Sequence, residues 1–378
     1  MRIVVTGMGA VSGVGLGVEA LRRALTEGRS GLTPLDASPP YRTAGRVGQV
    51  TLSHDPAVPR GQALLLAALD EALTQAGLTQ DLQQAHLYLG TVHGYHDHWL
   101  SRDGADAAAP SPWDLGPLLA GRGLDPARVS VLSTACTASS AAVGLALDAL
   151  RQGRLRQAIV AGFEVMTPFL YEGFVALRAL GRRCRPFDAE RDGLALGEGA
   201  AALVLEREDD ARRRGAEPLA EIAGYGFGLD LAHLTAPDPS GAGAAQALRQ
   251  ALDDAALDEL PGHINAHGTA TRHNDAMECA ALRRVFGQAL DGIPVTSTKP
   301  ITGHLCGAAG ATEVIAAALA LQDALVPATL GLERPDPRFA GLDFVRGAAR
   351  EWRGDTAVSM NSGFGGTNAA VVLRRVEP

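Results

Sequence analysis

The stretch from Val129 to Gly153 constrains this chain more than any other. It begins with apolar residues typical of a strand, passes through a turn of small residues that contains Cys136, and ends in a helical pattern closed by Gly153. The helical part is apolar on nearly every face before Asp148, which indicates a buried helix. Cys136 is therefore expected where a buried strand leads into the N-terminus of a buried helix. Unpaired N–H groups and the helix dipole favour a thiolate there, although a small cysteine can also be a plain core residue.

The composition limits the class of protein. With 378 residues, 46% of them hydrophobic, the chain is long enough to form the hydrophobic cores of two or three domains. Four cysteines without a regular spacing predict neither a disulfide framework nor a zinc site. Together with the lack of a basic-then-apolar leader, they predict a cytoplasmic protein. A net charge of −8 argues against nucleic acid as a partner, and no apolar run is long enough to predict a membrane span.

The sequence contains two related segments. Residues 129–150 and 293–325 each show a strand, a Ser-Thr pair, a turn, and a helix rich in Gly and Ala. This repetition predicts a duplicated α/β unit, with one half over 1–210 and the other over 211–378. In open α/β sheets a site lies at the carboxyl ends of the strands, where the two halves can meet. Helices are expected over 18–25, 62–76, 169–180, 243–256 and 307–325, and strands over 2–6, 87–92, 158–161, 200–205, 219–223, 263–266, 293–297, 357–360 and 369–373.

Three other patterns carry weaker predictions. The glycines from Gly7 to Gly17 are expected to form a turn, but their spacing does not match a dinucleotide-binding loop. The charged segment 207–218 is expected to be a solvated linker. His93, His96 and His98 could be metal ligands, yet a polar loop is the favoured interpretation because nearby acidic or cysteine ligands are lacking beyond Asp97.

Four short segments that follow predicted strands hold the residues best suited to chemistry. They are 135–138 with Cys136, 265–271 with His267, 299–310 with Lys299 and His304, and 361–368 with Phe364. A cysteine and two histidines from separate segments suit nucleophilic thiol chemistry if the fold brings them together. Taken by itself, His267 is more typical of a core or rim residue. Lys299 is the single lysine among 34 basic residues, which marks it as a candidate functional residue.

These segments resemble the β-ketoacyl-[acyl carrier protein] synthases, the condensing enzymes of fatty-acid and polyketide synthesis. The resemblance covers the whole chain and includes, in order, VVTGMGAVSGVG from Val4, the Cys136 turn, RPFDAERDGLALGEGAAALVLE from Arg185, HLTAPDPSG from His233, NAHGTAT from Asn265, KPITGHLCGAAGATE from Lys299 and GFGGTN from Gly363. It implies a thiolase-like fold, with two duplicated α/β halves in five layers, α-β-α-β-α. The helices after Cys136 and His304 would form the middle layer.

The resemblance also implies a decarboxylating Claisen condensation. Cys136 would attack an acyl thioester carried on a phosphopantetheine arm and become acylated. The backbone N–H groups of Cys136 and Phe364 would form the oxyanion hole, and the Phe364 ring would gate the acyl pocket. His267 and His304 would hold the malonyl thioester and promote loss of carbon dioxide, which neutral imidazoles can do by donating a hydrogen bond to the developing enolate.

Further residues are implied in supporting roles. Lys299 would orient His304 through a hydrogen-bond network with Glu313, since a buried lysine needs a carboxylate partner to keep its charge. Asp275 and Glu278 would support the site from behind. Structural roles are expected for a last group: ion pairs and turns for Asp188, Arg191, Asp192 and Glu198, and packing for Cys306.

The expected partner is an acyl carrier protein, and no metal or redox cofactor is expected because the phosphopantetheine arm arrives on that partner. Arg60, Arg182 and Arg185 are candidates for docking the acidic carrier, with simple solvation as an equal alternative. A homodimer is expected, and a heterodimer with a related ketosynthase subunit is the alternative. Two other functions remain open: a non-catalytic subunit that sets chain length, disfavoured because Cys136 is retained, and an acyltransferase that does not decarboxylate.

The chain also departs from the family pattern in four places. Ser362 stands where the first Phe of the C-terminal motif is expected, and Ala270 replaces a frequent glycine of the histidine motif. The segment 180–185 is shorter than usual, and the loop 101–112 is unrelated in composition. These differences leave the acyl chain length and the pairing partner open.

Overall fold

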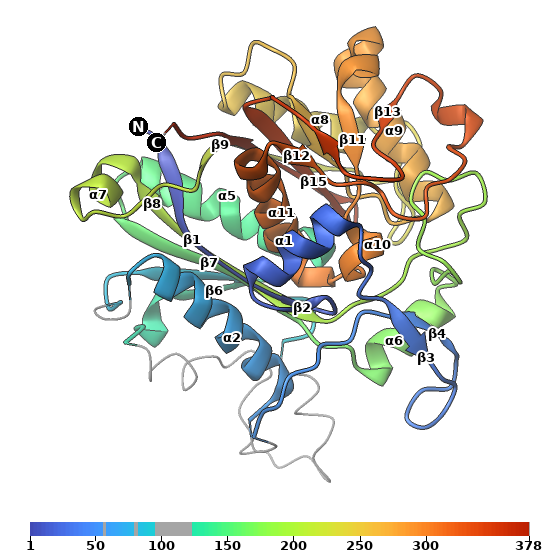
Figure 1. Cartoon of the computed structure of the whole chain (residues 1–378), viewed down its shortest axis with the longest axis horizontal. Helices are drawn as coiled ribbons and strands as arrows, with labels where there is room; N and C mark the ends of the chain where they lie inside the picture. Colours follow the sequence, from blue (N-terminus) through green and yellow to red (C-terminus); the bar gives the residue numbers. More distant parts are fainter. Residues whose placement is uncertain (56–57, 79–81, 95–122, 378) are drawn as a thin grey trace.

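The strands of this protein fall into two matching sets. The computed structural model describes residues 1–55, 58–78, 82–94 and 123–377 (Figure 1). The N-terminal set comprises β1 (Ile3–Ser12), β5 (His86–Gly90), β6 (Val129–Leu132), β7 (Gln157–Glu164) and β8 (Gly199–Arg207). The C-terminal set comprises β9 (Ala220–Leu229), β10 (His263–Asn265), β11 (Pro294–Thr296), β13 (Asp343–Phe344), β15 (Thr356–Gly363) and β16 (Thr367–Arg374).

Both halves use the same strand order. The N-terminal half runs β1-β8-β7-β5-β6, and the C-terminal half runs β9-β16-β15-β10-β11, with β13 beyond β11. In each half the first three strands are antiparallel, and the strands after them are parallel. Short pairing of β1 with β9, at Val4 with Glu221 and Val5 with Ala220, joins the edges of these two sets of strands. The predicted duplication of an α/β unit is confirmed.

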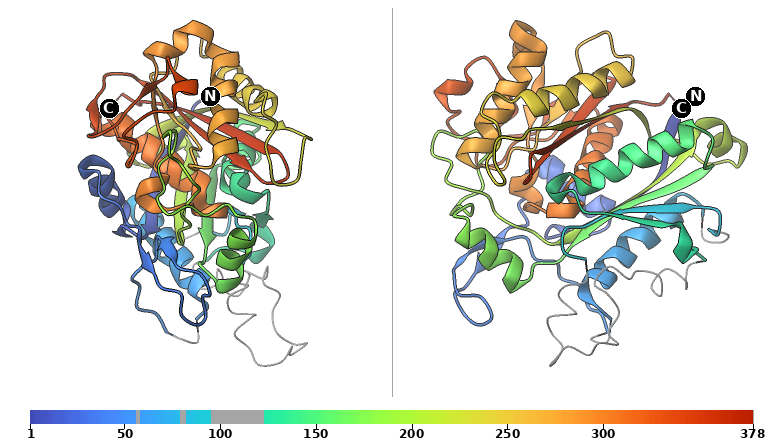
Figure 2. Two further views of the ribbon diagram at one scale, coloured as in Figure 1. Left: turned by 90° about the vertical axis from the view of Figure 1, so that its right-hand side faces the viewer. Right: turned by 180° about the vertical axis from the view of Figure 1, so that it is seen from behind.

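Helices separate and cover the two sheets. The middle layer is formed by α5 (Ala138–Arg151) and α11 (Ala309–Asp323), which contact each other and strands of both halves. Helix α2 (Arg60–Gln75) covers the outer face of the N-terminal sheet, while α8 (Ala242–Asp254) and α9 (Arg272–Phe286) cover the C-terminal sheet (Figure 2). Residues 309–321 of α11 are all buried, as a helix between two sheets requires. The five-layer thiolase-like arrangement is confirmed.

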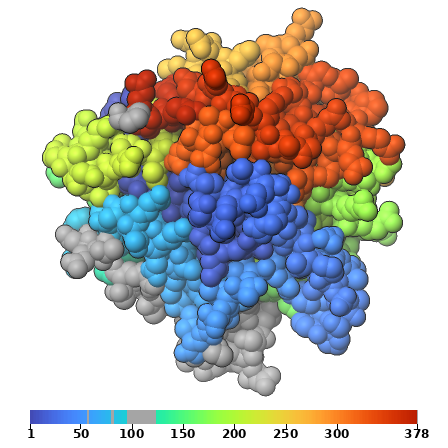
Figure 3. All heavy atoms as spheres, viewed as in Figure 1, coloured from blue at the N-terminus to red at the C-terminus, as the bar shows by residue number. Residues whose placement is uncertain are grey.

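Smaller elements complete the surface. They are β2 (Gly15–Leu16), α1 (Val18–Glu27), β3 (Thr33–Leu35), β4 (Gly45–Val47), α6 (Pro168–Ala176), α7 (Glu208–Arg213), α10 (Lys299–Thr302), β12 (Leu325–Val326) and β14 (Arg350–Glu351). On the face seen in Figure 3, the N-terminal segment in blue lies below the C-terminal segment in orange and red. Among the helices that the structure describes, none is both long and apolar enough to cross a membrane.

The glycine-rich segment near the N-terminus is a strand. β1 continues to Ser12, so the predicted start of the turn at Gly7 was wrong, and the turn is confined to Gly13 and Val14 before β2. A Cβ atom on Gly7 would lie 2.0 Å from the backbone oxygen of Ala72 in α2, and one on Gly9 would lie 1.9 Å from that of Ala68. These glycines let the α2 backbone approach the sheet closely.

Helices α7 and α9 are among those that the sequence did not predict. The charged segment 207–218, predicted to be a linker, contains α7, whose acidic first turn and basic last turn complement the helix dipole. Helix α9 follows the NAHGTAT motif directly, and its N-cap Thr271 accepts a hydrogen bond from the N–H of Asn274. Met277 and Leu282 on its buried face were the available sequence signal. The predicted helix 169–180 is shorter than expected, because α6 ends at Ala176.

Candidate active site

Cys136 lies in a tight turn between β6 and α5. This 3-10 turn spans Ala135–Thr137, and Ala135 adopts a left-handed conformation with φ 52°. The matching turn of the second half, Cys306–Ala308, precedes α11 and also begins with a left-handed residue, Cys306 at φ 45°. Cys136 is buried, and Cys306 packs in the core as predicted. The duplicated turns thus place the ends of both middle-layer helices at one site.

His304 reaches Cys136 from the other half of the molecule. Its Nε2 atom lies 3.0 Å from the Cys136 Sγ atom. Burial lowers the pKa of His304 well below its ordinary value, and the charge of Lys299 lowers it further, so the ring is neutral. Burial also raises the pKa of Cys136 to about 12, despite the nearby Lys299 charge. The resting pair is therefore a thiol beside a neutral imidazole, whereas the position at a helix start had predicted a thiolate.

Lys299 holds His267, which corrects the predicted contact with His304. The Lys299 Nζ atom lies 3.1 Å from His267 Nδ1 and 2.5 Å from Glu313 Oε1. An ammonium group can only donate hydrogen bonds, so His267 Nδ1 is the acceptor and the ring proton of neutral His267 is on Nε2. Burial lowers the pKa of His267 well below its ordinary value, with Lys299 and His304 adding to the effect. The two histidine rings lie with centroids 5.2 Å apart and planes at 86°.

Asn361 completes this buried network and was not predicted as a site residue. Its side-chain amide donates to Glu313 Oε2 at 2.6 Å and accepts from Ser140 Oγ at 2.7 Å. Glu313 is thus shared by Lys299 and Asn361, and the network reaches from α11 to β15 and α5. The motif around Asn361 was noted in the sequence, but a polar residue within a strand gives no indication of its partners.

Asp275 and Glu278 hold the loop that carries His267, in agreement with their predicted supporting positions. The Glu278 carboxylate accepts the backbone N–H groups of His267 at 2.6 Å and Gly268 at 2.8 Å. The Asp275 carboxylate accepts hydrogen bonds from the backbone N–H groups of Phe187 at 2.8 Å and Ala270 at 3.2 Å. Ala270, which replaces the family's frequent glycine, sits in a left-handed conformation with φ 66°. The two carboxylates in the first turns of α9 therefore fix a strained loop in place.

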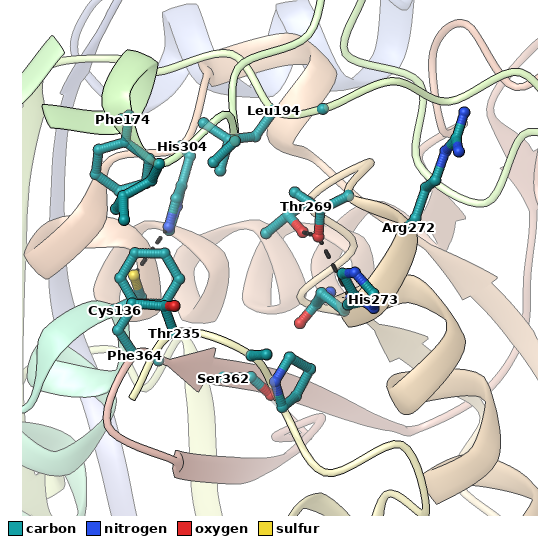
Figure 4. A pocket seen from close by; sticks show the side chains of 18 of the residues that line it. Cys136, Phe174, Leu194, Thr235, Thr269, Arg272, His273, His304, Ser362 and Phe364 are labelled. Carbon is teal, nitrogen blue, oxygen red and sulfur yellow. Dashed lines mark hydrogen bonds between the residues drawn. The ribbon is translucent and has the colours of Figure 1, made fainter. Parts of the chain in front are cut away.

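A cavity of about 380 Å³ opens from Cys136 and the two histidines. The Phe364 ring covers Cys136 and stacks on Phe174, with ring centroids 5.7 Å apart and an angle of 23° (Figure 4). The Phe364 backbone N–H forms a hydrogen bond with the Cys136 thiol, which lowers the thiol pKa in part. Gly363 is required beside it, because a Cβ atom there would lie 2.6 Å from Thr367 Oγ1 and 3.1 Å from the Cys136 nitrogen.

Ser362, the departure from the family pattern, lines the same cavity. Its hydroxyl donates to Asn368 Oδ1 at 2.7 Å, and Asn368 donates in turn to the Gly366 carbonyl at 3.1 Å. The serine therefore supports the turn that carries Phe364. A phenylalanine at this position could not make that contact.

The three arginines predicted for carrier docking do not form one surface. Arg60 donates to Glu198 at 3.0 Å and to the Val50 carbonyl at 2.6 Å, so its guanidinium is held inside the fold. Arg185 is mostly buried and pairs with Glu190 at 3.2 Å. Arg182 is the exposed one, with a side chain 93% accessible and Nε 3.3 Å from Asp192. The assignment of Arg60 to docking was wrong, because this residue anchors a buried carboxylate.

The remaining candidates have structural contacts. His93 Nδ1 lies 3.2 Å from Glu164, while His96 and His98 lie outside the described residues, as does the loop 101–112. Within the described ranges, no three histidine, cysteine or carboxylate side chains are close enough to hold a metal ion. Arg191 donates to Asp336 at 2.8 Å, and the Asp188 carboxylate accepts the N–H of Arg334 at 2.8 Å. These are the ion-pair and turn roles expected for the RPFDAERDG motif.

Fold and site together define a thiolase-like enzyme, with a thiol and two histidines meeting between two α/β halves. Comparison with known proteins narrows the class. The family model described as "Beta-ketoacyl synthase, N-terminal domain" matches residues 1–211, and that described as "Beta-ketoacyl synthase, C-terminal domain" matches residues 219–333. The chain therefore belongs to the β-ketoacyl synthase family, whose members are acyltransferase condensing enzymes of fatty-acid and polyketide synthesis.

Individual relatives agree over the whole length. The 3-oxoacyl-[acyl-carrier-protein] synthase 2 of Synechocystis sp. is 33% identical to this protein. The aligned region covers 100% of this chain and 98% of the Synechocystis chain. Among solved structures, a type II polyketide acyl-carrier protein in complex with its ketosynthase gives a TM-score of 0.90 at 29% identity, covering 100% of this chain and 99% of that one. The ishigamide ketosynthase/chain length factor gives a TM-score of 0.88 at 32% identity, with the same coverage of both chains.

Proposed function

We propose that this protein is a β-ketoacyl-[acyl carrier protein] synthase that carries its acyl chain on Cys136 and extends it with malonyl units. The observation that carries the proposal is the 3.0 Å contact between Cys136 Sγ and His304 Nε2, at the inner end of a cavity that His267 also lines. A non-catalytic partner subunit would have no use for a buried thiol paired with a neutral imidazole.

The first half-reaction transfers the acyl group to the thiol. The Cys136 S–H donates its proton to neutral His304 as sulfur attacks the thioester carbonyl, because burial keeps the free thiolate unfavourable. The backbone N–H groups of Cys136 and Phe364 would stabilise the developing oxyanion. The carbon–sulfur bond to the arm then breaks, and the leaving thiolate takes up the proton from His304. Acyl-Cys136 and a free arm thiol result.

The second half-reaction joins the carbon chains. A malonyl thioester loses carbon dioxide, and the electron pair of the broken carbon–carbon bond forms an enolate. His267 donates from Nε2 to the enolate oxygen, since Lys299 keeps Nδ1 unprotonated. The enolate carbon attacks the acyl-Cys136 carbonyl, and the Cys136–carbon bond breaks with its electron pair left on sulfur. The Cys136 thiolate then takes up a proton from water through His304, and the β-ketoacyl thioester leaves on the arm. Decarboxylation supplies the driving force, so the proposal includes no metal or redox cofactor.

The partners follow from this chemistry. The substrates would arrive on an acyl carrier protein in the cytoplasm, where the four cysteines, all free in the described fold, would stay reduced. The similarity to a ketosynthase bound to its carrier protein supports that partner. The similarity to a ketosynthase paired with a chain length factor supports a heterodimer as the alternative to a homodimer.

Intact-mass measurement after incubation with acyl-carrier protein tests the first step. We expect a gain of one acyl group on the wild-type chain and no gain on Cys136→Ala, and added malonyl-carrier protein should discharge the acyl group. His267→Ala should still become acylated but fail to discharge. If the wild type gains no mass, the chain is a partner subunit or needs one. If His267→Ala discharges normally, decarboxylation does not depend on His267.

A further inference from the structure

The cavity has a second end, away from Cys136, where two basic residues begin helix α9. Arg272 and His273 form the first turn of this helix and line the cavity beside Thr269 and Thr271. Both residues are exposed. Figure 4 shows them across the cavity from Cys136, with Thr269 between the two ends. A ligand that is bound at Cys136 and extends along this cavity would pass Thr269 and approach Arg272.

This end of the cavity carries positively charged side chains that form no ion pair within the described part of the chain. Among the residues that the structure describes, the Arg272 guanidinium has no hydrogen-bond or ion-pair partner, and the same holds for Arg178, which also lines the cavity. Asp192, the carboxylate among the described lining residues, is already bound by Arg182 at 3.3 Å. The cavity mouth thus carries excess positive charge on a chain whose net charge is −8. Such a site attracts an anion.

The position of Arg272 is also unfavourable for the helix itself. Positive side chains in a first turn are opposed by the helix dipole, which favours anions there. Thr271 already caps α9, so neither Arg272 nor His273 is needed to begin the helix. An anionic group beside Arg272 would be stabilised both by the guanidinium and by the helix start.

We propose that Arg272, with His273 beside it, binds the phosphate of the phosphopantetheine arm. The inference rests on the proposed function, which puts the thioester end of the arm at Cys136. Phosphate is the charged group at the other end of the arm, and a guanidinium can bind it with two parallel hydrogen bonds. The same phosphate occurs on a carrier protein and on coenzyme A, so both substrates should depend on Arg272.

The test compares malonyl-pantetheine with malonyl-phosphopantetheine in the decarboxylation assay. We expect the wild type to show a higher kcat/KM for the phosphorylated substrate. Arg272→Ala should reduce that preference by roughly 10- to 100-fold, the range of a lost hydrogen bond to a charged group, and Arg272→Lys should restore part of it. The effect should appear in KM and weaken with added salt. Arg284→Ala, an exposed arginine at the far end of α9, is the matched control and should keep the wild-type preference.

The outcomes separate the inference from the proposed function. If Arg272→Ala reduces kcat/KM equally for both pantetheine substrates, the residue supports the loop and does not bind phosphate. A loss with malonyl-carrier protein but none with malonyl-coenzyme A would show that Arg272 contacts the carrier surface, which also overturns the inference. If the wild type decarboxylates none of these substrates, the proposed function fails, and the inference fails with it.

Discussion

Burial governs the ionisation of the reactive thiol. Cys136 sits under Phe364 and against His304, with its pKa raised to about 12 by burial and lowered only in part by Lys299. The site therefore depends on proton transfer to His304 during attack, and a standing thiolate is not required. This makes the chemistry of Cys136 sensitive to pH in a specific way.

We expect alkylation of Cys136 by iodoacetamide to accelerate about tenfold per pH unit, because the thiolate fraction rises tenfold per unit below the pKa. The rate should show no plateau between pH 6 and roughly pH 10. Rates are measured by intact mass, with Cys136→Ala as the blank. A plateau near neutral pH would mean that the resting residue is a thiolate and that the helix start outweighs burial.

The buried ion pair of Lys299 and Glu313 is the second residue-scale feature. Lys299→Met leaves the Glu313 carboxylate without its cation, and we expect a loss of about 3–5 kcal/mol in the free energy of unfolding. Lys299→Met combined with Glu313→Gln removes both charges and should cost less than Lys299→Met alone. Urea unfolding of the wild type, Lys299→Met, Glu313→Gln and the double variant measures this coupling. Equal or larger loss in the double variant would show that the pair contributes little.

At the scale of elements, close backbone contacts position the site. Helix α2 lies against β1 at two glycines, and the turn before α5 lies against Gly363. At the two β1 glycines a backbone oxygen of α2 occupies the space of the missing Cβ atom, and at Gly363 the Thr367 hydroxyl and the Cys136 nitrogen lie close to that space. These contacts set how closely helices approach the sheets, and the sheets carry the loops of the site.

Gly9→Ala should destabilise the protein by more than about 3 kcal/mol, because its Cβ atom would collide with the backbone oxygen of Ala68 and α2 would have to move. Gly173→Ala is the matched control, since a Cβ atom in α6 there meets nothing within 4 Å. Alanine in place of that helical glycine should stabilise by roughly 0.5–1 kcal/mol. Thermal unfolding of both variants checks the prediction. Similar melting temperatures for the two would contradict it.

The elements predicted best were those with a strong pattern. The apolar helix after Cys136 and the repeated strand, turn and helix near His304 predicted the duplication, whereas the contact between Cys136 and His304 is seen only in the fold. Contacts between side chains that are distant in the sequence were not predictable. The sequence is compatible with a contact from Lys299 to either histidine, and only the fold shows that His267 is the one beside it. Arg60 was misassigned for the same reason, since its partner Glu198 lies 138 positions away. Asn361 gave no sign of its place in the network.

On the scale of the whole molecule, the two halves share their core. α5 belongs to the N-terminal half but packs on β9 and β16, and α11 belongs to the C-terminal half but packs on β7 and β8. Gly144 of α5 lies against the Tyr225 ring, where a Cβ atom would be 2.3 Å away. Each half alone would expose an apolar helix face to water.

We therefore expect the intact chain to unfold in one cooperative transition. The isolated segment 1–210, one of the two halves predicted from the sequence, should bind a hydrophobic dye and melt without a cooperative transition. Calorimetry and dye fluorescence measure both properties, with the full chain as control. An independent, cooperative transition in the fragment would show that the halves are separable domains.

Cys136 and His304 lie 168 positions apart in the chain. At a synthesis rate of roughly 5–20 residues per second, a ribosome needs on the order of ten seconds or more to travel between them. During that interval Cys136 has neither its histidine nor the Phe364 amide. Cys136 therefore emerges from the ribosome as an ordinary thiol, and its catalytic role begins only when the last strands have been made and docked.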